Sequence, residues 1–214
     1  IPGTTWSKVS TSLYEHGTAA IKTDGTLWSW GYNAQGNLGL NDRTHRSSPV
    51  QVPGTTWNEV TMGQYTAFAT KTDGTLWAWG LGSMYSGHLG LNDFVNRSSP
   101  TQIPGTTWKQ VSASVGFTIA TKTDGTLWSW GYGSQGQMGN NTSGPTSPKR
   151  SSPVQLPGTT WNEVVNAGGG IIATKTDGTL WSWGSNDDGG QLGQNNAVKY
   201  SSPVQIPGTT WSEY

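Results

Sequence analysis

Apolar and polar residues alternate over short segments of this chain, most clearly in the nine residues TDGTLWSWG from Thr23 to Gly31. The two tryptophans are two positions apart, so on a β-strand they lie on the same face. The Asp-Gly pair before them suits a type I′ turn, because both central residues of that turn need positive φ, which Gly adopts freely and Asp tolerates. The segment therefore predicts a tight hairpin turn that leads into a strand with two tryptophans on one face.

The same segment returns three times, starting at Thr72, Thr123 and Thr176, with at most one substitution. The motif PGTTW places tryptophans at positions 6, 57, 108, 161 and 211, and SSP triplets follow the same spacing. A period near fifty residues is typical of propeller blades. We predict a single repeat domain over 1–214, with repeats at approximately 6–56, 57–107, 108–160 and 161–210 and the start of a fifth.

Within one repeat the pattern predicts four short strands, which in the second copy cover roughly 57–61, 67–72, 76–80 and 100–102. Nowhere does an apolar i, i+3, i+4 pattern extend over three turns, so we expect almost no helix. The predicted fold class is all-β, a propeller-type array of four four-stranded blades. The array is either a closed four-bladed ring or part of a larger assembly.

All thirteen tryptophans belong to PGTTW or WxW motifs, so their placement follows the architecture. Burying the eight WxW tryptophans, at roughly 200 Å² each and about 25 cal/mol/Å², contributes at most on the order of 40 kcal/mol. We interpret these eight as the core between blades; the alternative is a platform that stacks sugars. They are Trp28, Trp30, Trp77, Trp79, Trp128, Trp130, Trp181 and Trp183.

Composition excludes several classes of site. Twelve basic and twelve acidic side chains give a net charge of zero, which argues against a nucleic-acid partner. No cysteine is present, the three histidines occupy unrelated places in their repeats, and no G-x-S-x-G motif occurs. Asn186 to Gly189 resembles a fragment of a calcium loop but lacks its further carboxylates. We therefore expect no enzymatic activity, no cofactor and no metal, and no long apolar run predicts membrane insertion.

A lysine precedes each TDG triplet, at positions 22, 71, 122 and 175, and could form a ring of charges with a functional target. We instead interpret the segment as a solvated turn, in which the Asp accepts local backbone hydrogen bonds and the Lys discourages pairing at the strand end.

The segment WSWGYNAQGNLG from Trp28 to Gly39 resembles the repeat of the regulator of chromosome condensation family. The pattern recurs from Trp128, from Trp181 with one inserted residue and from Trp77 with two. The resemblance covers essentially the whole chain and implies a β-propeller with one four-stranded blade per repeat. It also implies a protein-binding loop surface. We expect a bacterial or viral member, because the founder's seven blades and basic surface are missing here.

Two of the four connections in a repeat vary, and in an up-and-down blade they share one end of the strands. The TDGT and PGTT connections are nearly invariant and share the opposite end. We predict a loop-built recognition surface at the variable end; the alternative is that long loops simply tolerate change. The contact residues that we predict there are Tyr14, His16, Arg43, His45, Arg46, Tyr65, Met84, Tyr85, Phe94, Phe117 and Tyr200.

These observations together predict a non-enzymatic binding or structural module that recognises a protein or a glycan. The alternatives are a lectin-like propeller and a guanine-nucleotide exchange or chromatin factor like the family founder. IPGTTW occurs at both ends of the chain, at 1–6 and 206–211, so we also expect self-association or continuation into further repeats. The chain opens on Ile1, as expected for a processed product or an excised piece, and among compartments an extracellular, virion or cell-surface location is favoured.

Overall fold

Sixteen β-strands account for all regular secondary structure in residues 5–12, 16–83, 89–187 and 189–211, which the computed structural model describes. The first sheet contains β1 (Trp6–Thr11), β2 (Gly17–Lys22), β3 (Leu27–Gly31) and β4 (Arg46–Gln51), and the second contains β5 (Trp57–Met62), β6 (Thr66–Lys71), β7 (Leu76–Gly80) and β8 (Arg97–Ile103). The third contains β9 (Trp108–Ala113), β10 (Phe117–Lys122), β11 (Leu127–Gly131) and β12 (Arg150–Gln155), and the fourth contains β13 (Trp161–Ala167), β14 (Gly170–Lys175), β15 (Leu180–Gly184) and β16 (Tyr200–Ile206).

Each sheet is a separate four-stranded blade in which neighbouring strands are consecutive in the chain and antiparallel. The all-β prediction of four four-stranded blades is confirmed, and no helix that could cross a membrane occurs in the described ranges. The fourth strand is longer than predicted, because the polar residues before Pro100 also pair: Arg97 lies opposite Gly80. Pro100 is accommodated because β8 is an edge strand, where a missing N–H breaks no ladder.

The TDGT turn differs from the predicted type I′. Only its glycine has positive φ, +77° at Gly25, while Asp24 stays in the ordinary negative region. The Gly25 N–H donates to Lys22 O and the Lys22 N–H to Thr26 O, at 2.9 Å each. This geometry is that of a hairpin loop that ends in a left-handed glycine. The Asp24 carboxylate accepts hydrogen bonds from the Thr26 N–H at 2.9 Å and the Thr26 hydroxyl at 2.7 Å.

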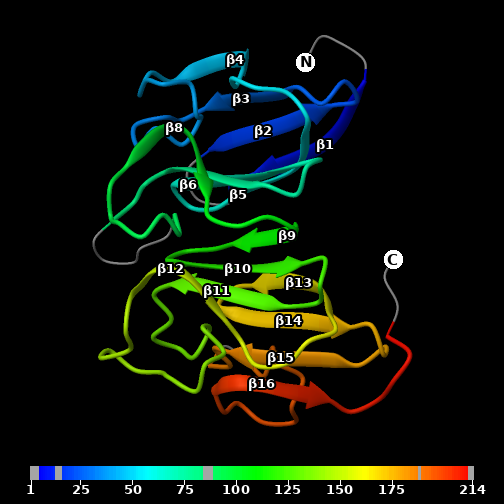
Figure 1. Ribbon diagram of the computed structural model, residues 1–214. Coiled ribbons are helices and arrows are strands. Elements are labelled where there is room, and N and C mark those ends of the chain that lie inside the picture. The colour runs from blue at the N-terminus through cyan, green and yellow to red at the C-terminus, as the bar shows by residue number, and fades with distance from the viewer. Residues whose placement is uncertain (1–4, 13–15, 84–88, 188, 212–214) are drawn as a thin grey trace.

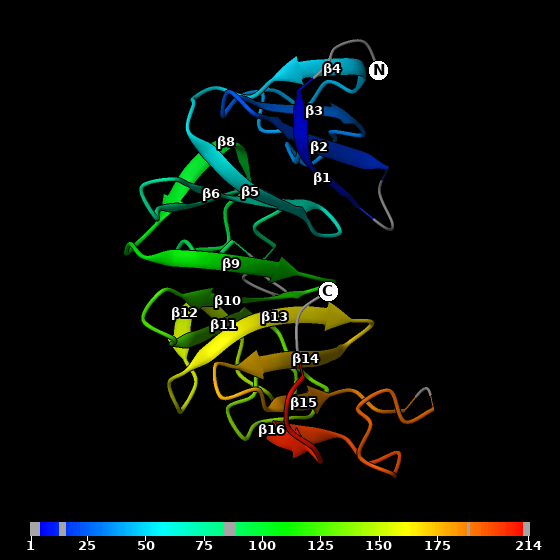
Figure 2. The ribbon, with the colours of Figure 1, turned by 90° about the vertical axis from the view of Figure 1, so that its right-hand side faces the viewer.

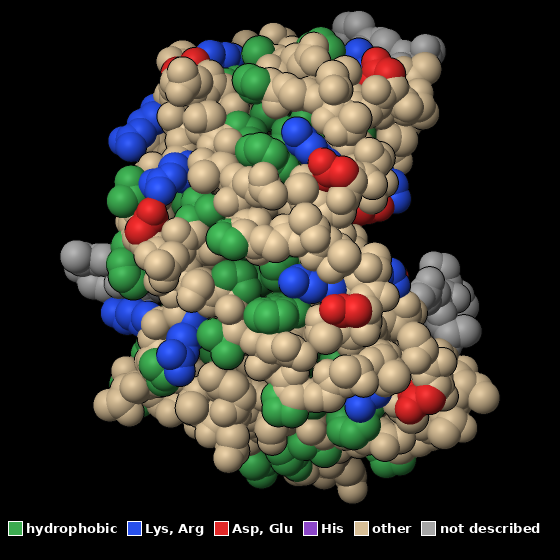
Figure 3. Space-filling model, viewed as in Figure 1, with side chains coloured by type: hydrophobic (Ala, Val, Ile, Leu, Met, Phe, Trp, Pro, Cys, Tyr) green, Lys and Arg blue, Asp and Glu red, His purple; other side chains and the backbone are tan. Residues whose placement is uncertain are grey.

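The four blades follow one another around an open arc (Figures 1 and 2). Contacts between blades join β1 to β5, β5 to β9 and β9 to β13, so the first strands line the concave side and the fourth strands lie outside. The first and last blades stand at opposite ends in both views, and the space-filling surface is hollowed between them (Figure 3). This chain by itself is therefore not the closed four-bladed ring that was one of the two predicted arrangements.

One tryptophan per blade forms the centre of each packing layer. Trp79, Trp130 and Trp183 are 0% exposed and contact aliphatic side chains of the preceding blade. The indole N–H of Trp79 donates to Asn37 O, and that of Trp183 to Gln137 O, at 3.0 Å each. These three tryptophans therefore lie in the core between blades. Trp30 occupies the same position in the first blade and is only half-buried, because no blade packs on that side.

The first tryptophan of each WxW pair lies at the rim of the core, and Trp77, Trp128 and Trp181 pack against the clusters between blades. Trp28, Trp77, Trp128 and Trp181 are half-buried, and each donates its indole N–H to the TDGT threonine hydroxyl at 2.8–2.9 Å. The repeated lysine is less solvated than expected, because its Nζ lies 4.2–4.6 Å from the centroid of this ring and 4.5–5.0 Å from that of the PGTTW tryptophan. Such cation–π contacts contribute about 0.5–1 kcal/mol at exposed sites.

Candidate binding surface

The two invariant connections of each repeat lie together at the same end of the strands. The main-chain N–H of Trp57 donates to Gly25 O at 3.0 Å, so the PGTTW segment of the second blade rests on the TDGT turn of the first. Trp108 and Trp161 repeat this bond with Gly74 and Gly125 at 2.9 Å. These bonds join each blade to the next, which gives both motifs a structural reason to stay constant. The connections that vary are at the opposite end, as predicted.

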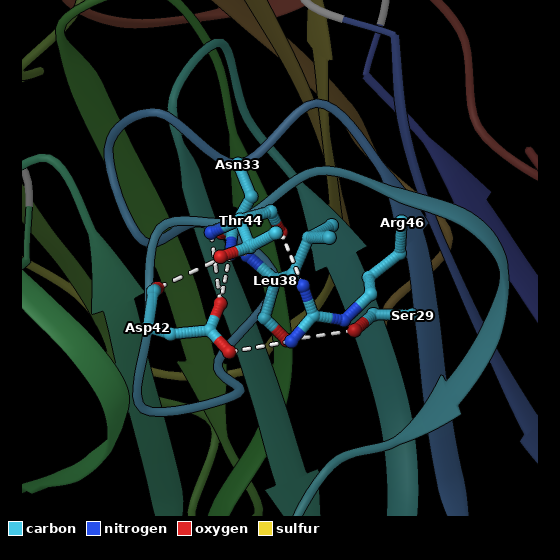
Figure 4. A network of polar contacts seen from close by, with 6 residues as sticks. All are labelled: Ser29, Asn33, Leu38, Asp42, Thr44 and Arg46. Carbon is cyan, nitrogen blue, oxygen red and sulfur yellow. Dashed lines mark hydrogen bonds and ion pairs between the residues drawn. The ribbon is translucent and has the colours of Figure 1, made fainter.

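A buried asparagine organises the connection between the third and fourth strands of the first blade (Figure 4). Asn33 is 0% exposed, and its side-chain oxygen accepts the N–H of Leu38 at 2.8 Å. Its Nδ2 donates to Asp42 O at 3.1 Å and to Thr44 O at 3.2 Å. The Ser29 hydroxyl adds a bond to Leu38 O at 2.7 Å and so ties the loop to β3. The Asn33 amide and the Ser29 hydroxyl therefore fix the path of the connection between β3 and β4.

Two predicted contact residues hold this loop in shape. The Arg46 guanidinium pairs with Asp42 at 2.5 Å and donates to Thr44 O at 2.9 Å (Figure 4). The hydrogen bond from the Thr44 N–H holds the pKa of Asp42 below its ordinary value of 3.8, and the hydrogen bond from Arg46 lowers this pKa further. His45 accepts the Asn33 N–H on Nδ1 at 2.9 Å and stacks on Tyr32. Arg46 is thus an internal ion-pair partner, and His45 is exposed but already bonded.

The fourth blade repeats the asparagine arrangement at the segment that resembles a calcium loop. Asn186 is 0% exposed, donates to Asn196 O at 2.8 Å and Val198 O at 3.0 Å, and accepts the Leu192 N–H at 3.0 Å. Asp187 pairs with Lys199 at 2.6 Å. Within the described part of the chain, no group of three or more His, Asp or Glu side chains lies close enough to hold a metal.

A groove of about 480 Å³ opens at the variable end between the second and third blades. Its walls come from described parts of the four variable connections of these two blades: 64–65, 81–83, 115–116 and 132–149. The lining residues are Gln64, Tyr65, Leu81, Ser83, Val115, Gly116, Tyr132, Ser134, Gln137, Pro145 and Lys149. Val115 is 49% exposed, and the Tyr132 hydroxyl donates to Pro145 O at 3.2 Å. Aromatic, aliphatic and amide groups therefore share one concave surface with a single ammonium.

The groove contains one of the predicted contact residues, Tyr65, and several that the sequence reasoning missed. Tyr132, Val115 and Lys149 escaped notice because Tyr132 belongs to the repeated WSWGY pattern and the other two are single residues in loops of different length. Their only signal in the sequence is membership of the variable connections.

The other predicted residues are dispersed. His16, Arg43 and Phe94 are exposed, Phe94 at 43%, but do not line the groove. Tyr200 is half-buried against the core of the last two blades and accepts a hydrogen bond from Asn196 at 3.0 Å. Phe117 is 1% exposed within the same core, so its prediction as a surface contact is wrong. Tyr14, Met84 and Tyr85 lie outside the described residues.

Comparison with known proteins identifies the repeat. The model of the regulator of chromosome condensation (RCC1) repeat matches residues 24–69, 73–121, 124–171 and 177–211, and a second model of this repeat matches 108–137. The ultraviolet-B receptor UVR8 of Arabidopsis thaliana is 32% identical over 198 residues, which are 86% of this chain and 42% of that protein. Human protein RCC2 is 31% identical over 145 residues, 64% of this chain and 27% of RCC2.

Solved structures with the same fold include human WBSCR16, at a TM-score of 0.79 and 23% identity, and yeast RCC1 (Prp20) bound to Kap60, at 0.80 and 18%. They cover 94% and 98% of this chain, whereas this chain covers 52% and 51% of theirs, so it spans about half of each. These relatives are eukaryotic, and the expectation of a bacterial or viral type has no support from them.

Proposed function

Since this chain belongs to the regulator of chromosome condensation repeat family, we propose that it is a non-enzymatic protein-binding module whose partner occupies the groove between the second and third blades. One observation supports this assignment above others: the groove is lined by the connections whose length and sequence differ between repeats, although Tyr132 and Gln137 come from the repeated start of their connection. The invariant connections are already used to join the blades.

The chemistry of the groove suits a protein surface. Tyr65 and Tyr132 offer flat aromatic faces with polar tips, a type of residue enriched among the few that dominate interface energetics. Val115 provides exposed apolar area, and Gln64 and Gln137 can hydrogen-bond to a peptide backbone. The yeast relative supports the same kind of partner, because its structures describe it bound to Kap60 and report its binding properties to Gsp1p and histones.

The test selects ligands from a displayed library of random linear and cyclic peptides on the immobilised chain, with purified Gsp1p and histones as further probes. Each binder is then measured against a Tyr65→Ser/Tyr132→Ser variant. We expect binding to fall by about tenfold or more, since truncating one central interface aromatic costs more than about 1 kcal/mol and this variant truncates two.

The matched control is a Thr55→Ala/Thr106→Ala variant at the constant end, where both residues are exposed. Binders should keep their affinity for it. If binders lose affinity for the control variant and keep it for the tyrosine variant, recognition takes place at the constant end of the blades and the proposal is wrong.

A further inference from the structure

We propose that a second copy of this chain docks its first blade on the fourth blade of the first copy, head to tail, through the same contact that already joins consecutive blades. This inference is independent of the proposed groove, because it uses the two end faces of the arc. The chain contains three internal examples of the contact, so each end face can be compared with buried counterparts.

The first blade exposes the side that its successors bury. Val9 occupies the position of Val111 and Val164, three residues after the PGTTW tryptophan, and is 71% exposed, against 7% and 0% for those two. Trp6 and Trp30 are half-buried, although their equivalents in the third blade, Trp108 and Trp130, are 4% and 0% exposed. The side chains that pack between blades elsewhere are therefore present on this face, but no neighbouring blade of the same chain covers them.

The fourth blade exposes the complementary side. Leu180 and Ile206 are half-buried, whereas Leu127 and Leu156 at the same positions of the third blade are 0% and 1% exposed. Val165 is 49% exposed and lines a shallow hollow with Ile172. Hydrophobic side chains gather at this end of the molecule in the space-filling view (Figure 3). An isolated patch of this kind on one side of a blade marks an interaction surface.

Polar groups on the two faces also match. The N–H groups of Asn41, Asn92 and Asn141 donate across each junction to Ser98, Ser151 and Ser201, each at 2.7 Å. Asn195 is the corresponding residue of the fourth blade and has the same left-handed backbone, with a φ of 55° against 60–63° for the other three asparagines. In the proposed contact its N–H donates to Ser47 O of the second copy. Likewise Trp30 would donate to Gln191 O, as Trp79 does to Asn37 O.

The charges at the concave edge are complementary as well. Lys8 pairs with Glu59 at 2.8 Å, and both residues are two positions after their PGTTW tryptophan. Glu163 is the corresponding residue of the fourth blade, so it would face Lys8 of the second copy. Two copies of the same end face would lack this matched pair, because the first blade has only its lysine and the fourth blade only its glutamate. The contact is therefore heterologous, and it either closes into a ring of two chains or continues as a filament.

One segment must move for the contact to form. The Trp211 N–H donates to Gly178 O at 3.1 Å, the bond that Trp57 makes with Gly25, while its ring is 45% exposed. Residues 207–211 thus occupy the place that the Trp6 strand of a second copy would take. We expect Trp211→Ala to strengthen association, because it weakens this competitor.

The test measures mass by light scattering and sedimentation over a wide range of concentrations. We expect the 22.8 kDa chain to form species of two or more copies. Val9→Asp and Val165→Asp should each abolish them, since every junction needs one face of each kind. Their mixture should restore a complex of two chains, because the first variant keeps an intact fourth blade and the second an intact first blade. The matched control is Val198→Asp, which alters a 59% exposed valine in a loop and should associate normally.

Circular dichroism of each variant checks that the fold is retained. A wild-type chain that stays at one copy at every concentration would overturn the proposal. So would association of Val165→Asp alone, which means that like faces meet, or loss of association in Trp211→Ala, which would place that indole inside the contact.

Discussion

At the scale of single residues, position within the blade decides what an identical side chain does. Gly39, Gly90 and Gly139 lie against the buried tryptophan of the next blade. A Cβ added to each would lie 2.8–2.9 Å from the indole nitrogen of Trp79, Trp130 and Trp183, respectively. Their φ values of 65–72° also favour glycine. The glycine and the tryptophan therefore form one packing unit, although they come from different blades.

Replacing Trp130 with Ala should lower the free energy of unfolding by about 3–5 kcal/mol, because it opens a cavity between the second and third blades. Trp30→Ala is the matched variant: the residue has the same place in its blade but is half-buried, so its loss should cost less than half as much. Urea unfolding at low protein concentration measures both. Equal losses would mean that the end face is as well packed as the inner layers.

At the scale of the element, the hairpin turn works through its carboxylate. The Thr126 hydroxyl and then the Thr126 N–H hold the pKa of Asp124 below its ordinary value of 3.8, and Asp24, Asp73 and Asp177 are lowered in the same way by their own threonines. A folded pKa below the unfolded one stabilises the folded state above the unfolded pKa, and this contribution is lost as the pH falls through the folded pKa.

Asp124→Asn should therefore be less stable than the wild type near neutral pH, and the gap should narrow as the pH falls below about 4. Thermal unfolding at a series of pH values gives the comparison. A gap that stays constant down to the lowest pH would show that the carboxylate charge does not matter for the turn. Thr126→Ala is the companion variant, because it removes the hydroxyl that contributes most to the lowered pKa.

At the scale of the whole molecule, the main contacts between described strands of different blades join consecutive blades. Stability is then approximately a sum over blades and junctions, and each end blade has one junction. Strands β3, β11 and β15 have the same sequence, LWSWG, and so the same intrinsic amide exchange rates.

In dilute solution, hydrogen exchange in the central β11 should be slower than in β3 and β15, since only β11 lies in a blade that is packed on both sides. Mass spectrometry of the corresponding peptides measures this directly. Uniform exchange in all three would mean that the arc unfolds as one cooperative unit.

Local patterns in the sequence determined much of this molecule. Four repeats, antiparallel four-stranded blades and the shared end of the TDGT and PGTT connections follow from periodicity, turn residues and strand alternation, which depend on neighbours in the chain. Packing between blades depends on residues some fifty positions apart, and only the tertiary structure decided its details. It separated Trp79, which is fully buried against the preceding blade, from Trp77, which is half-buried at the rim of the same cluster beside Lys71. It also placed Phe117 in the core, engaged Arg46 and His45 within their own loop, and brought Tyr65 and Tyr132 to one groove. The arc is open because side chains from both neighbouring blades set the angle between them, which no local pattern in the sequence specifies.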